Sequence, residues 1–208
     1  MQLHIMQQIN ITLLFSEPFN QATINDKDLL ETYVEKDDEK QGQFQIARGQ
    51  NSLMLQLSDR QTQIIFERNR FLINKGDVNK ESFATVVDIL KEADKSGFID
   101  LSSAESVGYN FDALIDVENA FVEQLEEMGG VTGIKNEDEE VDRAGVRFRL
   151  VGENGDRREF QIRTTEENRA HIHGNYHHSD IAKLKKQNGL LSQMKKDYDD
   201  FKAVIEDL

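Results

Sequence analysis

The chain has 208 residues, no cysteine and a formal net charge of −14, because 39 acidic side chains outnumber 25 basic ones. This composition excludes disulfide bonds, thiolate catalysis and cysteine-ligated zinc. It also disfavours non-specific binding to nucleic acid or anionic lipid, whereas a basic protein would be attracted. The first residues lack the pattern of a signal peptide, and no segment approaches 18 apolar residues. We therefore expect a cytoplasmic protein without a membrane span.

The first 43 residues predict a strand, a short helix and a loop. Apolar side chains occupy the odd positions from Leu3 to Phe15, interrupted only at Gln7, and this alternation is typical of a long strand with one buried face. A helix is expected to follow, with Asn25 or Asp26 as its N-cap. The charged stretch EKDDEKQGQ then predicts an exposed loop. The apolar residues at helical spacing are Leu29, Leu30, Tyr33 and Val34.

Three strands and a helix are predicted next. The turns between the strands are GQN and SDR, and the helix begins after NKGDVN. Gly97 stands where a left-handed residue usually closes a helix. The strands are marked by Phe44 and Ile46, by Leu53, Leu55 and Leu57, and by Ile64 and Phe66; the helix is marked by Phe83, Val86, Val87, Leu90 and Ala93.

A further strand and helix precede a change in composition. Val107, Tyr109 and Phe111 alternate as in a strand, and an apolar helical face follows that two glycines end. Residues 129–144 are poor in apolar side chains and include five acids between Glu137 and Asp142, so we expect a flexible acidic connection. This divides the chain into units 1–128 and 145–208, which could also form one joint domain. The helix is marked by Val117, Phe121, Leu125 and Met128.

The segment after the connection predicts a three-stranded antiparallel sheet. Two alternating stretches flank the turn signal ENGD. A three-residue loop, 153–155, pairs Val146 with Ile162 and Phe148 with Phe160, which buries one consistent face; a two-residue turn would mix apolar and polar residues. We therefore predict a left-handed Gly155 in a bulge. Ala170 and Ile172 continue the apolar face in a third strand.

Together these elements predict an α+β protein with antiparallel sheets backed by helices. The order strand, strand, strand, helix occurs near residues 43–95 and again near 145–207, with negligible identity between the copies. Two β-β-β-α units are one interpretation. The commonness of such meanders is the other, and it is slightly favoured.

The last 29 residues predict a long amphipathic helix that starts at Ser179 or Asp180. Two rows of residues recur every seven positions, as in a coiled-coil seam. The seam could pack on the protein's own sheet, which is favoured, or pair with a second copy. Asn188-Gly189 favours a break, but the heptad spacing continues through it. The residues assigned to a possible dimer seam are Leu184, Leu191, Met194, Tyr198, Phe201 and Ile205.

A cluster of arginines and histidines is the main candidate for a binding surface. Seven of the eleven arginines lie between Arg143 and Arg169, and four of the five histidines lie in RAHIHGNYHHSD. With Ala170 and Ile172 facing the core, alternate residues must point to the opposite face. That face could be covered by the acidic connection, by a second subunit or protein segment, or by a phosphorylated ligand or nucleic acid. The predicted binding residues are Arg147, Arg149, Arg157, Arg163, Arg169, His171 and His173.

A metal site is a minor alternative for the same histidines. His171 and His173 share a strand face, and His177 follows closely, so two or three imidazoles could meet on one ion. The nearby arginines oppose this by repelling a dication. Gly174 to His178 are expected to form the turn out of this strand. No cofactor is expected.

No nucleotide-binding, metalloprotease or nucleophile-elbow motif occurs in the sequence. We therefore expect a non-enzymatic, acidic interaction or inhibitor protein of the regulatory, immunity or phage type, which binds a protein partner. A basic partner would suit the net charge. The alternatives are a module that binds anionic ligands or nucleic acid through the arginine and histidine face, and a histidine-dependent metalloenzyme.

Overall fold

The computed structural model describes residues 2–34, 43–128, 145–152, 155–165, 169–182, 184 and 189–207. Within these ranges, nine strands form one antiparallel sheet in the order β2-β3-β4-β5-β1-β6-β9-β8-β7. The predicted α+β class is confirmed, with one sheet in place of several. The strands are β1 (Gln2–Phe15), β2 (Phe44–Arg48), β3 (Ser52–Leu57), β4 (Thr62–Glu67), β5 (Arg70–Gly76), β6 (Ala104–Asp116), β7 (Gly145–Val151), β8 (Arg157–Thr165) and β9 (Arg169–His178).

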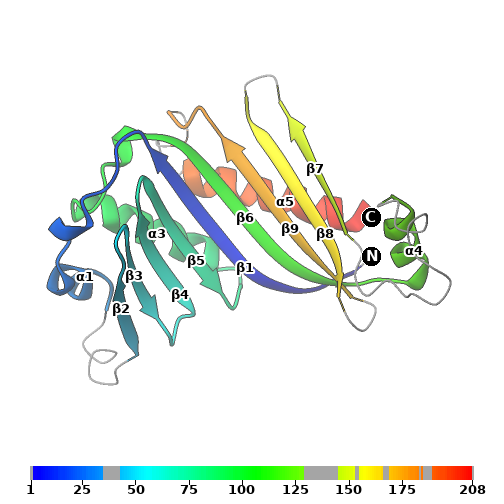
Figure 1. Ribbon diagram of the computed structural model, residues 1–208, viewed down its shortest axis with the longest axis horizontal. Helices are drawn as coiled ribbons and strands as arrows, with labels where there is room; N and C mark the ends of the chain where they lie inside the picture. Colours follow the sequence, from blue (N-terminus) through cyan, green and yellow to red (C-terminus); the bar gives the residue numbers. More distant parts are fainter. Residues whose placement is uncertain are drawn as a thin grey trace.

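Four α-helices accompany the sheet in the described residues. Figure 1 shows α3 and α5 lying across one face of the sheet, with α1 and α4 near its two ends. None of the four is long and apolar enough to cross a membrane. The helices are α1 (Asp26–Tyr33), α3 (Ser82–Lys95), α4 (Asn119–Met128) and α5 (Gly189–Asp207).

The face toward α3 and α5, here called the helix face, is apolar. Alternation along each strand directs every second side chain to this face, where β3 and β4 contribute buried residues at alternate positions. Helix α5 buries Met194, Phe201 and Ile205 among them, and the Phe83 and Tyr198 rings join α3 to α5 at a centroid distance of 4.9 Å. The core therefore lies in a single layer between sheet and helices.

The opposite face, here called the open face, carries no described helix over its central strands (Figure 1). Its residues alternate with the core residues and are mainly polar, as at Gln63, Asn74 and Asn110. No aromatic side chain of the described strands points to this face, because every Phe and Tyr in them occupies a helix-face position.

Several predicted details are confirmed. Asn25 caps α1, since its side chain accepts a hydrogen bond from the backbone N–H of Asp28. Gly97 has a φ of 71° directly after α3, and Gly155 has a φ of 80°. The hairpin register pairs Val146 with Ile162 and Phe148 with Phe160, as the three-residue loop requires.

Two predictions at the level of elements are wrong, and one strand is missing from the predicted elements. Strand β5 is the missing one, although Phe71 and Ile73 alternate as core residues. Gly174 to His178 continue β9, because β6 pairs with all of them and β8 pairs with Gly174 to His177. Helix α5 begins at Gly189, so Ser179 and Asp180 do not cap it. The described residues 179–182 and 184 lie outside the helix.

The apolar faces expected for β1, α4 and β7 are also incomplete. Ile5 is 52% exposed, because register shifts between β1 and β6 change the alternation near it, and Met6 packs against the core in its place. Met128 is 71% exposed at the end of α4. Leu150 is 45% exposed on the outer strand β7. The predicted loop at 35–43, except for residue 43, and the acidic connection at 129–144 lie outside the described residues.

Gly174 is required where α5 crosses β9. A Cβ at this position would lie 2.6 Å from Cδ2 and 2.8 Å from Cε2 of Phe201, which is fully buried. We expect Gly174→Ala to lower the free energy of unfolding by about 1–3 kcal/mol, because the ring or the helix must shift. Urea denaturation measures this change.

Gly108→Ala is the matched control for Gly174→Ala. It lies on the neighbouring strand β6, and its Cβ would meet the Tyr176 carbonyl oxygen at 3.8 Å and the Thr12 Cβ at 3.9 Å, which are ordinary contacts. Its effect should stay below about 1 kcal/mol. Equal losses for the two variants would contradict the packing of α5 on Gly174.

Candidate functional site

All seven predicted binding residues lie on the open face of β7, β8 and β9. The register places Arg147 beside Gln161, Gln161 beside His173, and Arg163 beside His171. We call this surface the arginine face. It carries five arginines and a single carboxylate, Glu159, in the described residues of these strands. The arginine face comprises Arg147, Arg149, Arg157, Arg163, Arg169, His171 and His173.

Glu159 holds two of these arginines in place. Arg147 donates to Glu159 Oε1 from Nε at 2.9 Å and from Nη2 at 2.6 Å, and Arg149 donates to Oε2 at 2.9 and 2.8 Å. The hydrogen bonds from Arg149 and then Arg147 lower the pKa of Glu159. Both arginine side chains remain more than half exposed, so N–H donors are still directed to solvent. One carboxylate therefore orients two guanidinium groups and leaves an excess positive charge.

The two strand histidines share a carboxylate that sequence reasoning did not assign. His171 Nε2 lies 3.2 Å and His173 Nδ1 lies 2.9 Å from the same Oδ1 of Asp112 on β6. Burial raises the pKa of Asp112, but the hydrogen bonds from His171 and His173 outweigh it and lower that pKa to about 2. Asp112 alternates with core residues in β6, yet nothing in the sequence indicates that β6 lies beside β9.

The proposed metal ligands do not form a triad. His177 lies four residues beyond His173, opposite Gly108 and Arg157. Burial, with the charges of Arg157 and His178, lowers the pKa of His177. Among the described residues, no three His, Asp or Glu side chains are placed to hold one metal ion.

A ladder of side-chain amides crosses the centre of the open face. Asn175 donates to Asn110 at 2.7 Å, Asn110 donates to Asn10 at 2.7 Å, Asn10 donates to Asn74, and Asn74 donates to Gln63 at 3.1 Å. These five amides lie on five neighbouring strands, β9, β6, β1, β5 and β4. All four hydrogen bonds run in the same direction, from β9 towards β4. They help to hold these five strands in register on the open face, as core packing does on the helix face.

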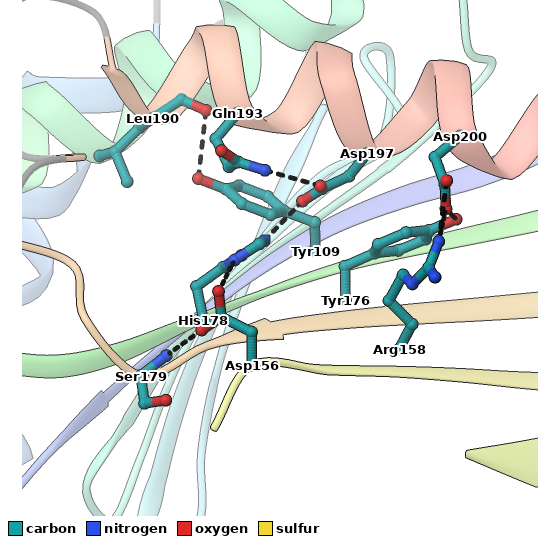
Figure 2. Close-up of polar contacts among 10 residues, drawn as sticks. All are labelled: Tyr109, Asp156, Arg158, Tyr176, His178, Ser179, Leu190, Gln193, Asp197 and Asp200. Carbon is teal, nitrogen blue, oxygen red and sulfur yellow. Dashed lines mark hydrogen bonds and ion pairs between the residues drawn. The ribbon is translucent and has the colours of Figure 1, made fainter. Parts of the chain in front are cut away.

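His178 belongs to a second polar cluster, on the helix face (Figure 2). Its Nε2 lies 2.7 Å from Asp197 Oδ2 on α5, and its Nδ1 lies 3.4 Å from Asp156 Oδ2 before β8. Gln193 donates to Asp197 Oδ1 at 2.7 Å. We call His178, Asp156, Asp197 and Gln193 the histidine clasp. Both ring nitrogens are engaged by carboxylates, so the clasp joins α5 to the sheet and leaves no free nitrogen to act as a base.

The histidine clasp favours a charged imidazole. Burial by itself lowers the pKa of His178, but the hydrogen bond and charge of Asp197, and then those of Asp156, raise it above its usual value. Beside it, Arg158 and the Tyr176 hydroxyl both contact Asp200 of α5, at 2.8 Å from Oδ1 and 2.9 Å from Oδ2. Burial and that hydrogen bond raise the pKa of Tyr176, so it stays protonated.

A cavity of about 380 Å³ opens beside these residues, between α5 and the end of the β7–β8 hairpin. Its lining includes Leu150 and Val151 of β7, Arg158 of β8, and Lys196 and Asp200 of α5. The cavity thus joins the apolar end of β7 to charged side chains of β8 and α5.

The residues assigned to a dimer seam lie on the inner side of α5 or close to it. Met194, Phe201 and Ile205 are buried against the chain's own sheet, so their burial needs no second copy. Leu184, Leu191 and Tyr198 are half-buried and pack against the same core.

No protein-family model matches the chain, and no curated protein matches it.

The amide ladder predicts a graded effect of amide removal. Asn10→Ala deprives Asn74 of a donor and Asn110 and Thr12 of an acceptor, and Asn10 is only 6% exposed. We expect a loss of about 1–3 kcal/mol in the free energy of unfolding. Asn175→Ala, which removes only the terminal amide, should cost clearly less. Equal costs in urea denaturation would show that the ladder does not act as a connected unit.

The histidine clasp predicts a pH-dependent stability. A histidine pKa that is raised on folding stabilises the protein fully below about 6.5, and this contribution is lost as the pH rises through the folded value. His178→Phe should therefore cost about 3 kcal/mol in mildly acidic solution, because Asp197 loses its buried partner, and less in alkaline solution. Urea denaturation over a pH series measures the difference between wild type and variant.

His177→Gln is the control for the pH series. The pKa of His177 is lowered on folding. The contribution of His177 to folding stability therefore has the opposite sign to that of His178 and is lost as the pH falls below about 6.5. Removing His177 should make the protein relatively more stable in acid. If the loss in free energy of unfolding caused by His178→Phe does not change with pH, this would contradict a charged His178 imidazole in the histidine clasp.

Proposed function

We propose that the chain is a non-enzymatic interaction protein that seats an acidic segment of a partner protein on the arginine face. One observation carries the proposal. A chain with a net charge of −14 gathers five arginines and one carboxylate on the open side of three neighbouring strands. Guanidinium groups make bidentate contacts with carboxylates, and Glu159 already orients two of them.

Charge outside the arginine face favours a partner of mixed composition. The exposed sides of the helices are rich in acids, such as Asp88 and Glu92 on α3 and Glu123 on α4. A partner that is basic overall but carries an acidic segment would match both surfaces. Electrostatic complementarity of this kind raises association rates and specificity.

The main alternative is a module that binds an anionic ligand or nucleic acid at the same face. The exposed N–H donors of Arg147 and Arg149 favour it, because phosphate accepts such donors as carboxylate does. The net charge repels a polyanion, and no aromatic side chain of the described strands is available on the open face for base stacking. A protein segment is therefore the better match.

The order of elements supports the interpretation of two repeated units, although the first meander has four strands, β2 to β5, and the second has three. A long strand, a short helix, a meander and a long helix follow one another as β1, α1, β2–β5 and α3, and again as β6, α4, β7–β9 and α5. In each half the long strand pairs with the last strand of its meander. This order supports an origin by duplication, in which the arginine face belongs to the second unit alone.

A triple substitution tests the proposed function. Arg147, Arg149 and Arg163 are changed together to Gln, and binding of a fluorescent, glutamate-rich peptide is followed by anisotropy at several salt concentrations. We expect affinity to fall at least about tenfold, since three charge-assisted contacts are lost, and the salt dependence to flatten. Arg70→Gln, on the open face of β5, is the matched control.

Circular dichroism should show that the triple variant keeps its fold, because these arginines are exposed. Salt-insensitive binding, or equal binding by wild type and the triple variant, would overturn the proposal. Preferred binding of an oligonucleotide of the same charge would instead support the alternative.

A further inference from the structure

Strand β7 forms an edge of the sheet and pairs, among the described strands, only with β8. The Gly152 N–H donates to the Asp156 carbonyl at 2.8 Å. Hydrogen-bonded and non-bonded pairs alternate in an antiparallel ladder, so the backbone groups of Arg147, Arg149 and Val151 point away from β8. The edge therefore offers three successive N–H and C=O pairs to another strand.

Side chains on both faces of β7 remain accessible at this edge. Phe148 is 38% and Leu150 is 45% exposed on the helix face, and Val151 is 66% exposed on the open face. The cavity of about 380 Å³ begins at Leu150 and continues toward α5. Proline, a bulge or an inward-pointing charge protects many edge strands, and β7 has an unbroken register with none of these; its only charges, Arg147 and Arg149, lie on the open face.

We propose that β7 accepts an extended segment of a partner protein as a tenth strand, in which acidic and apolar residues alternate. This inference rests on the proposed function and names the form in which the acidic segment binds. Acidic side chains would face Arg147 and Arg149 on the open face. The intervening apolar side chains would cover Phe148 and Leu150 and reach the cavity beside α5. Backbone hydrogen bonds would supply affinity, and the alternating side chains would supply specificity.

Charge argues against a second copy of this chain as the added strand. Two copies of β7 paired antiparallel about Phe148 would place Arg147 of each opposite Arg149 of the other. Like charges directly opposite each other destabilise a strand pair. Glu159 already contacts both arginines of its own chain and offsets only one of the two positive charges. An acidic strand from another protein removes this repulsion.

Two peptides of identical composition separate strand addition from simple charge attraction. One alternates Glu and Val over eight residues, and the other carries four Glu followed by four Val. Anisotropy measures the binding of each to the full chain. We expect the alternating peptide to bind more tightly, because only it can place all its acids on one face of a strand. Backbone amide exchange of Arg147, Arg149 and Val151 should slow when it binds.

A proline variant tests the outward backbone groups. Arg149→Gln removes the charge, whereas Arg149→Pro removes the charge and one outward N–H that the fold itself does not use. Proline is tolerated at such edge positions. Binding of the alternating peptide should be about fivefold weaker for Arg149→Pro than for Arg149→Gln, as expected for one lost hydrogen bond. Val151→Pro against Val151→Ala repeats the comparison without a change of charge.

The outcomes distinguish the two proposals. Equal binding of both peptides, with no difference between each proline variant and its control, would overturn strand addition and leave the proposed function standing. Failure of both peptides to bind the wild type would overturn both. A dimer in sedimentation that Arg149→Pro dissociates would show that a second copy occupies the edge, and would also overturn the inference.

Discussion

Pairing of β1 with β6 is the constraint on which the rest of the structure depends. The two strands run antiparallel from Gln2 opposite Asp116 to Phe15 opposite Ala104, although about a hundred residues separate them in the chain. Each is also the attachment point for one half of the sheet, β5 on one side and β9 on the other. Without this pairing the helix face would not be continuous, and α3 and α5 would have no common surface to cover.

The same pairing separates the two faces chemically. Core side chains from both halves meet under the helices, so the alternate positions must accumulate on the open face, where the amide ladder crosses β1 and β6 without a break. The arginine face lies at one end of that polar surface. Its arginines are oriented by Glu159, and its histidines are held by Asp112, so much of the surface is arranged before any ligand binds. Preorganisation of this kind reduces the entropy cost of binding.

Histidine cluster RAHIHGNYHHSD divides between the two faces because it is one continuous strand. His171, His173 and His177 point to the open face, whereas His178 points to α5 and closes the histidine clasp with Asp197 and Asp156. Four neighbouring histidines therefore have different surroundings: two share Asp112, one has its pKa lowered by burial and nearby charge, and one has its pKa raised. The extended backbone of β9 therefore directs His178 away from the other three histidines.

By itself the sequence determined what depends on neighbours along the chain. Alternation located eight of the nine strands, the caps at Asn25 and Gly97 located helix ends, and consistency of one apolar face set the β7–β8 register. Alternation also placed all seven arginine-face residues on one side. Only the tertiary structure decided which strands are neighbours, and with them the partners Asp112, Asp197 and the amide ladder. It also decided that α5 begins at Gly189 and that its Phe201 packs over Gly174. The physical reason is that periodicity reports which side chains share a face, whereas pairing between distant strands depends on the whole sheet closing over one core.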